Sequence, residues 1–302
     1  MDNDRIAFVG LGAMGLGMAK VLVRSGFRVC GFDADEAREQ EFAGSSGVPA
    51  DPGSVTGVAA AVLSVVNAEQ VEGILFGDGR FGPGGLAGAL AEGAVVVNTV
   101  TVPPSFAERT AARVGADRYL DAPVSGGTKR AAEGALSILA SGTPEAFRRA
   151  EPVLEAMAQT VYRLGEEAGR GSAMKAVNQL LAGVHIVAAA EAITFGMRQG
   201  LDPGQIVDVI GECAGNSWML QNRGRHIVEG DWTPLSAVEI FVKDMGLVSD
   251  IAREARFGAP MSAVALQMFL AASGSGHARE MDAAVAKVYA RQSGLALPGD
   301  AA

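Results

Sequence analysis

Cysteine and histidine are scarce in this 302-residue sequence, which contains two cysteines and three histidines. The two cysteines lie far apart, and the histidines follow no metal-site spacing with them or with one another. These residues are Cys30, Cys213, His185, His226 and His277. The counts exclude a disulfide framework and provide no zinc motif. We therefore expect no metal ion, and we expect the protein to work in a reducing compartment, the cytoplasm.

Positive charge is also in deficit, because 25 basic residues face 34 acidic ones and the formal net charge is −9. No basic face for nucleic acid or anionic lipid is evident, so we expect neither as a partner. The uncharged stretch 52–68 contains proline and two glycines and is too short and polar to span a bilayer. Glycines interrupt the apolar start at 6–19, and acidic residues precede it, which argues against a signal peptide.

Glycine, by contrast, is abundant: 40 residues, about 13% of the chain against about 7% in ordinary proteins. The absence of a Gly-X-Y period excludes collagen, and a hydrophobic content of 49% excludes disorder. Single cores stop growing at roughly 250 to 300 residues, so a chain of this length is expected to form two domains.

Short apolar runs alternate with helical patterns along the first half of the chain. The expected strands are 6–9, 28–32, 61–66, 95–98, 119–122, 136–140 and 160–163. Such alternation predicts βαβ units around a mostly parallel sheet, and fully apolar strands predict helices on both of its faces. We expect an α/β domain of Rossmann type, with a doubly wound sheet, over residues 1–166.

Strand signals stop after this domain. Residues 172–199 contain no proline and have apolar residues at helical spacing, which predicts one long, largely buried helix. Further helices are expected near 203–213, 234–256 and 262–272, with Pro203 at a helix start. Residues 167–302 are therefore predicted to form an all-α domain for substrate binding and oligomerisation, which the long helix joins to the first domain.

The segment after the first expected strand has the spacing of a dinucleotide-binding turn. Gly10, Gly12 and Gly15 form the pattern G-x-G-x-x-G between a strand and a helix. The first glycine permits a tight turn, the second lets the backbone approach a pyrophosphate, and the third allows close helix–strand packing. The helix N-terminus adds N–H groups and partial positive charge. An ordinary glycine turn is the alternative, and the complete context favours the dinucleotide.

An acidic residue follows the second expected strand, as this type of site requires. Asp33 lies eighteen residues after Gly15, where a carboxylate accepts hydrogen bonds from the adenosine ribose. The same carboxylate repels a 2′-phosphate, and Ala34, the next residue, provides no arginine to hold one. The sequence therefore predicts NAD rather than NADP.

A second glycine motif follows the strand expected at 119–122. Ser125, Gly126 and Gly127 provide a hydroxyl and closely spaced N–H groups that suit a carboxylate. A plain glycine turn is the alternative for this motif taken alone.

Three features occur together in the order and at the separations of a known family: GLGAMG at 10–15, DAPVSGG at 121–127, and Lys175 on the long helix. The sequence resembles the β-hydroxyacid dehydrogenase family over nearly its whole length. Within that family, segments 179–186, 214–219 and 240–244 are most similar to members that oxidise L-threonate. The resemblance implies an NAD-dependent dehydrogenase that converts L-threonate to 2-oxo-tetronate.

The resemblance also implies roles for individual residues, with Lys175 as the catalytic general acid and base. Taken alone, a lysine near a helix start more often extends along the surface to water. Lys243, next to Asp244, could by itself be half of a solvated surface pair. The implied cofactor contacts are Gly10, Leu11, Gly12, Ala13, Met14, Gly15, Asp33, Val66, Asn67, Thr101 and Lys243. The implied substrate contacts are Ser125, Gly126, Gly127, Asn178 and Gln179.

One position departs from the family pattern. Family members usually have asparagine four residues after the lysine, whereas this chain has Gln179 there and Asn178 one residue earlier. Both lie about one helical turn from Lys175, so either amide could contact substrate. A longer amide is compatible with a larger, more hydroxylated substrate.

The alternatives are a 3-hydroxyisobutyrate dehydrogenase, a tartronate semialdehyde reductase, and a catalytically inactive nucleotide-binding scaffold. Imine reductases of this architecture typically lack the lysine. We expect a small-molecule substrate and a homo-oligomer, dimer or tetramer.

Overall fold

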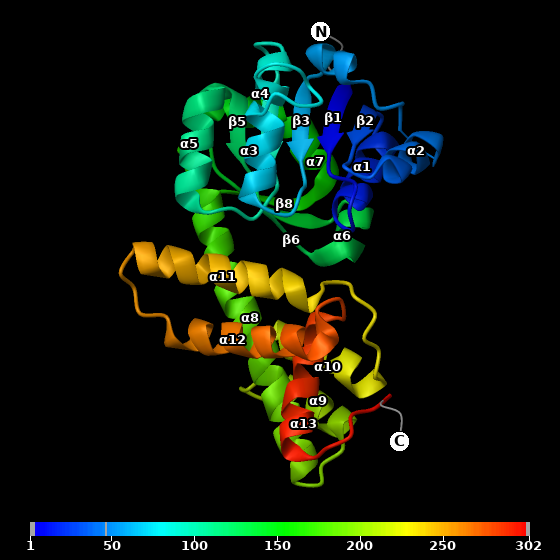
Figure 1. Ribbon diagram of the computed structural model, residues 1–302, viewed down its shortest axis with the longest axis vertical. Helices are drawn as coiled ribbons and strands as arrows, with labels where there is room; N and C mark the ends of the chain where they lie inside the picture. Colours follow the sequence, from blue (N-terminus) through cyan, green and yellow to red (C-terminus); the bar gives the residue numbers. More distant parts are fainter. Residues whose placement is uncertain (1–3, 46, 300–302) are drawn as a thin grey trace. The chain divides into compact units, whose positions relative to one another are not determined.

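The computed structural model describes residues 4–45 and 47–299 (Figure 1). Packing divides the chain into two units, Met1–Lys175 and Ala176–Ala302. The division falls inside the long helix α8 (Arg170–Arg198), whose first residues belong to the first unit. The boundary expected after residue 166 lies just before this helix and stays a prediction.

The first unit is built on a five-stranded parallel sheet in the order β2-β1-β3-β4-β5. Its strands are β1 (Arg5–Val9), β2 (Arg28–Phe32), β3 (Ala60–Leu63), β4 (Val95–Asn98) and β5 (Tyr119–Asp121). The order runs outward from β1 in both directions, which confirms the predicted Rossmann-type, doubly wound arrangement.

Alternating side chains of β1 enter two different cores, because successive residues of a strand point to opposite faces. Ile6 and Phe8 pack in one core with α1 and α7, whereas Ala7 and Val9 pack in the other with α3, α4 and α5. These helices are α1 (Gly15–Arg24), α3 (Ala68–Phe76), α4 (Gly85–Ala89), α5 (Pro104–Val114) and α7 (Pro144–Met157). A short helix, α2 (Glu36–Ser45), follows β2. Both faces of the sheet are therefore covered, as its apolar strands predict.

Two of the expected strands belong to a separate, smaller sheet. It has the order β6-β7-β8, with β7 (Leu136–Ala140) antiparallel to β6 (Val124–Ser125) and parallel to β8 (Ala158–Arg163). Burial alternates along β7, whereas every residue of β3 and β4 is buried. This one-sided burial distinguishes β7 from the strands of the main sheet. Helix α6 (Gly127–Glu133) connects β6 to β7.

The second unit is all-helical, as predicted. It contains the rest of α8 together with α9 (Pro203–Gly211), α10 (Trp218–Glu229), α11 (Val238–Glu254), α12 (Pro260–Ala272) and α13 (Val285–Ser293). Ile186 and Ile193 of α8 lie in its core with Phe241 and Phe269, whose rings stack at 5.1 Å. The sequence did not predict α10 or α13. Helix α10 contains Gly224, a poor helix former, which lets Val207 approach the backbone closely.

Helix α8 is long and apolar enough to cross a membrane by length and composition alone. Half of its most apolar stretch is buried within the structure, so protein side chains cover much of this surface. Its composition is therefore explained in large part by a place in the protein core.

Candidate active site

The three glycines of the first motif differ in how strongly the surrounding structure requires glycine at their positions. Gly10 has a φ of +102°, and a Cβ there would lie 2.3 Å from the Ser64 carbonyl oxygen. A Cβ on Gly15 would lie 1.8 Å from the Gly10 carbonyl oxygen. Around Gly12, by contrast, one protein atom, Arg38 Nη1, comes within 4 Å of such a Cβ, at 3.9 Å. The fold itself requires Gly10 and Gly15, whereas the backbone at Gly12 borders open space.

The start of helix α1 has the character of an anion site. Its N-cap residue is Met14, whose side chain makes no capping hydrogen bond to the first turn in the described part of the chain. The backbone N–H groups of Ala13, Met14 and Gly15 lie at this end of the helix, where the macrodipole is positive. The predicted pyrophosphate contacts 10–15 thus form one turn that leads into one helix N-terminus.

Asp33 follows β2 and its carboxylate holds the glycine turn in place. Oδ2 accepts a hydrogen bond of 2.6 Å from the Leu11 N–H, and Oδ1 accepts one of 3.0 Å from the Asp35 N–H. Its side chain is only 11% exposed. The residue predicted to bind ribose therefore lies against the loop predicted to bind pyrophosphate.

Two arginines that were not predicted as site residues approach Asp33. Arg38 Nη1 lies 3.7 Å from Asp33 Oδ1, and Arg80 donates a 3.3 Å hydrogen bond to the Asp33 carbonyl oxygen. Arg80 also forms an ion pair with the buried Glu39. The residue that directly follows Asp33 is Ala34, which carries no positive charge. The guanidinium near Asp33 comes instead from Arg38, which the first turn of α2 brings back to the carboxylate. The place of Arg38 in the first turn of α2, five residues after Asp33, was the signal that could have found it.

The remaining predicted cofactor residues follow neighbouring parallel strands. Val66 and Asn67 come after β3 and Thr101 comes after β4; in the sheet β3 lies beside β1, and β4 lies beside β3. Carboxyl ends of parallel strands meet at one sheet edge, where open α/β sheets bind their ligands. Val66 is 50% exposed, and Asn67 caps α3 by accepting a 2.9 Å hydrogen bond from the Gln70 N–H.

The second motif lies at the junction of β6 and α6. Ser125 ends β6, and Gly126 and Gly127 have φ values of +140° and +73°. A Cβ on Gly127 would meet nothing within 4 Å, so this glycine is required by its backbone conformation and not by crowding. The backbone is accessible here, as the predicted binding of a carboxylate requires.

Lys175 lies in the first turns of α8 and is 8% exposed. This burial contradicts the surface lysine that a helix start alone would favour. Asn178 is half-buried and Gln179 is 7% exposed. Three and four residues after the lysine, both amides lie on its side of the helix.

Gln179 and Lys243 share a buried acidic partner. Gln179 Nε2 donates a 2.5 Å hydrogen bond to Asp244 Oδ2, and Lys243 Nζ donates one of 2.6 Å to Asp244 Oδ1. Asp244 is 3% exposed, so the alternative of a solvated Lys243–Asp244 surface pair is wrong. Asn178 Nδ2 donates a 2.8 Å hydrogen bond to Gln179 Oε1 and extends the network. Asp244 was not predicted as a site residue, because adjacent residues of a helix usually face different directions.

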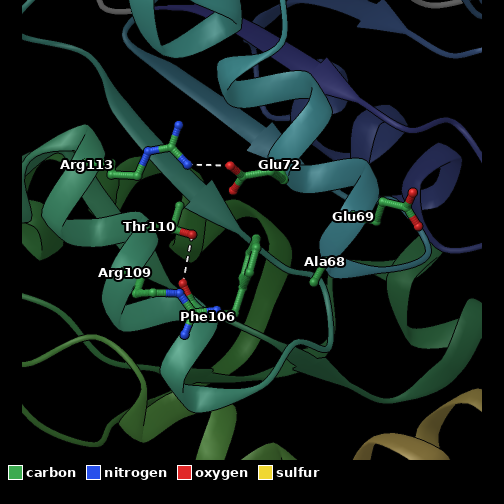
Figure 2. Close-up of a pocket in the computed structure, with 7 residues that line it drawn as sticks. All are labelled: Ala68, Glu69, Glu72, Phe106, Arg109, Thr110 and Arg113. Atoms are coloured by element: carbon green, nitrogen blue, oxygen red, sulfur yellow. Dashed lines mark hydrogen bonds and ion pairs between the residues drawn. The ribbon is translucent and has the colours of Figure 1, made fainter.

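The first unit has a hollow of about 390 Å³ between α3 and α5. Figure 2 shows the residues that line it. It is lined by Ala68, Glu69, Glu72, Phe106, Arg109, Thr110 and Arg113, and Arg113 pairs with Glu72. None of its described lining residues belongs to the predicted site.

A metal site needs several histidine, cysteine or carboxylate side chains close together. Residues 4–45 and 47–299 contain no group of three or more histidine, cysteine, aspartate or glutamate side chains that could hold a metal ion.

Two family models match almost all of the chain. Residues 5–165 match the NAD binding domain of 6-phosphogluconate dehydrogenase. Residues 169–289 match the NAD-binding region of NADP-dependent 3-hydroxyisobutyrate dehydrogenase.

Similar proteins match over nearly their full length. An L-threonate dehydrogenase of Cupriavidus necator is 50% identical over 99% of both chains. One from Escherichia coli is 45% identical, over 97% of this chain and 96% of its own. A crystal structure of a 3-hydroxyisobutyrate dehydrogenase from Salmonella typhimurium is 42% identical, with a TM-score of 0.85 over 95% of this chain and all of that one.

Proposed function

This chain belongs to the β-hydroxyacid dehydrogenase family, and on that premise we propose that it oxidises L-threonate to 2-oxo-tetronate. Membership makes it an NAD-dependent oxidoreductase. The structural observation that carries the proposal is Lys175, buried on α8 one turn before Asn178 and Gln179. The names of the relatives at 45% and 50% identity support threonate as the substrate.

The residues of the first unit fit NAD. The open space at Gly12 and the N-terminus of α1 suit a pyrophosphate, and the Asp33 carboxylate suits the ribose hydroxyls. Val66, Asn67, Thr101 and Lys243 are proposed to make the remaining contacts. When bound, NAD supplies the acceptor for the hydride that leaves the alcohol carbon.

Lys175 is proposed to move the proton. Oxidation of the alcohol removes a hydride from carbon and a proton from the hydroxyl, and the amine of Lys175 in its neutral form accepts that proton. In the reverse direction its ammonium group returns the proton to the developing alkoxide. Because Lys175 is buried, little water competes for this transfer.

The Ser125-Gly126-Gly127 turn is proposed to bind the substrate carboxylate. The Ser125 hydroxyl and the backbone N–H groups are donors, and the glycines leave no side chain in the way. Fixing the carboxylate orients the neighbouring C2 hydroxyl for proton transfer.

We assign the two amides different tasks. Gln179 uses its Nε2 on Asp244 and its Oε1 on Asn178, so both of its polar atoms are engaged within the protein. Asn178 is half-buried. We propose that Asn178 contacts a substrate hydroxyl and that Gln179 holds Asn178 in position.

The test is NADH formation, followed by its absorbance, with L-threonate, 3-hydroxyisobutyrate, glycerate and serine as substrates. We expect turnover of threonate, and K175A should lower kcat by at least about 100-fold while NADH still binds. The control is K20A, which replaces a lysine of α1 that has no proposed role, and this variant should keep the kcat of the parent protein. Normal turnover by K175A would contradict the mechanism. Absence of NADH formation with L-threonate would contradict the proposed substrate.

A second candidate substrate is 3-hydroxyisobutyrate, because the crystal structure of the 42% identical Salmonella protein carries that name. The same screen separates the two candidates by their kcat/KM values.

Homo-oligomerisation is proposed from a row of exposed apolar side chains on α8. Val177, Leu181 and Phe195 are 55%, 48% and 66% exposed and lie on one side of the helix by their spacing. Light scattering after size exclusion should give a dimer or tetramer, and L181E should lower the mass; a monomeric parent protein would contradict this. A cytoplasmic location is proposed from the two unpaired cysteines, Cys30 and Cys213, and cell fractionation tests it.

A further inference from the structure

Asp121 is a fully buried carboxylate that the proposed chemistry does not use. It lies at the end of β5, at the start of the DAPVSGG segment, and is 0% exposed. Its side chain accepts hydrogen bonds from the Gly169 N–H at 3.0 Å, the Ser172 N–H at 2.8 Å and the Ser172 hydroxyl at 2.7 Å. The Ser141 hydroxyl approaches it at 3.3 Å. Three of these four donor groups belong to residues at the start of α8.

These contacts replace an ordinary helix cap. The first N–H groups of a helix have no partner within it and usually bond to the side chain of the N-cap residue. Gly169, just before α8, has no side chain, and its N–H and that of Ser172 bond to Asp121 from another strand. The negative charge also complements the positive end of the helix macrodipole.

A second strand end completes the attachment. Ser141, directly after β7, accepts a 2.9 Å hydrogen bond from the Gly171 N–H on its hydroxyl oxygen. A Cβ on Gly171 would lie 2.3 Å from the Leu139 carbonyl oxygen and 2.9 Å from that of Asp121. The first turn of α8 therefore lies directly against the backbone at the ends of β5 and β7, and its rotation is fixed there.

Lys175 follows Ser172 by three residues, which is less than one helical turn. We infer that Asp121 is a positioning residue: by holding the Gly169 and Ser172 amides it sets the rotation and height of α8, and with them the place of the Lys175 amine. The inference rests on the proposed catalytic role of Lys175. All of the groups involved belong to the first unit of the chain.

The Asp121 side chain accepts all of its hydrogen bonds out of contact with water. Burial raises the pKa of Asp121 above its ordinary value, and the hydrogen bonds from Ser172 and Gly169 oppose this rise only in part. Such bonds to an ionised acceptor are stronger and shorter than neutral ones. Substitution by asparagine keeps the shape but removes the negative charge at the helix end. It also places an NH₂ group where Oδ1 accepts the Ser172 hydroxyl proton, so the first turn is held more weakly.

The experiment compares S172A and D121N with T143A, all as full-length chains. S172A removes the 2.7 Å hydroxyl contact and keeps both backbone bonds, which makes it the variant that should fold. T143A removes the side-chain cap of α7 in the same unit and leaves the α8 contacts in place. Displacement of a reacting group by about 1 Å costs on the order of 100-fold in rate. We expect kcat to fall about 10-fold in S172A and about 100-fold in D121N, with KM for NAD and NADH affinity within about two-fold of the parent.

T143A should lower Tm and keep kcat within about two-fold, because it weakens the fold without moving Lys175. Unchanged kcat in S172A and D121N, or an equal loss in T143A, would overturn the inference.

A double-mutant cycle separates positioning from a general structural effect. In a K175A background S172A should change the residual rate by less than about two-fold, because the group it positions is gone. The same fold loss in both backgrounds would show that Asp121 does not act through the lysine. Full activity of K175A alone would instead refute the proposed function on which the inference rests.

Discussion

Arg38 Nη1 lies 3.7 Å from Asp33 Oδ1, so the carboxylate that is proposed to select NAD is bordered by a guanidinium group. The Arg38 side chain is 52% exposed, and its Nη1 would lie 3.9 Å from a Cβ on Gly12. Positive charge suited to a 2′-phosphate is therefore present, and Asp33 is what opposes that phosphate.

Removing the charge of Asp33 should accordingly admit NADP. We expect D33N to raise the ratio of kcat/KM for NADP to that for NAD at least about 10-fold, equivalent to about 1.4 kcal/mol. The double variant D33N/R38Q should lose most of this gain, because the guanidinium has been removed. An equal gain in both variants would show that Arg38 takes no part in cofactor choice.

Gly12 and Gly15 should respond differently to the same substitution. G12A introduces a methyl group into space that holds one protein atom at 3.9 Å, so it should leave Tm unchanged and weaken NADH binding about 10-fold or more. G15A would place its methyl group 1.8 Å from a carbonyl oxygen, so it should lower Tm strongly or prevent folding. Thermal unfolding and NADH fluorescence titration measure the two effects, and a stable G15A variant would contradict the packing seen here.

Asp244 should matter for substrate binding because it joins Gln179 to Lys243. D244N removes the charge that Lys243 pairs with, so we expect KM for threonate to rise about 10-fold. D250N is the matched control, since Asp250 lies on the same helix and pairs with Arg253 at the exposed surface. Equal KM values in the two variants would show that the buried network does not affect the site.

The stability of the helical unit should depend on one buried ion pair. Arg223 of α10 donates to both carboxylate oxygens of Asp282, at 2.7 and 3.0 Å, and Asp282 is fully buried. R223A leaves this charge without its partner and should lower the free energy of unfolding by about 3–5 kcal/mol. R225A, on the same helix, breaks an exposed pair with Asp208 and should cost less than about 1 kcal/mol. Urea titration compares them, and similar losses would contradict the difference in burial.

The features predicted best from sequence were those that local chemistry determines. The turn at Gly10 and Gly15 requires glycine for steric reasons, and the parallel strands are recognised by their continuous apolar residues. The family membership and the helical second half were also confirmed. The roles of individual site residues stay predictions, although Lys175 is buried as a catalytic lysine on α8 should be.

What the sequence did not reveal depends on contacts between distant residues. Asp121 and Ser172 are 51 positions apart, and Gln179 and Asp244 are 65 apart, so no local pattern connects them. The second sheet was missed because one face of β7 is not fully buried and its partner β6 has only two residues. Helix α10 forms despite Gly224 because close packing outweighs its low helical propensity.

The division between the two units falls within helix α8, directly after Lys175. Lys175 therefore belongs to the first unit, and Asn178 and Gln179 belong to the second. Exchange of residues 176–302 with those of a relative would therefore replace Asn178, Gln179, Lys243 and Asp244 together. The glycine turn at 10–15 and Lys175, which is proposed to transfer the proton, would be kept unchanged. Recombination at this one position in the chain offers evolution, and protein engineering, a way to change the groups that are proposed to contact substrate hydroxyls while the proposed proton donor stays in place.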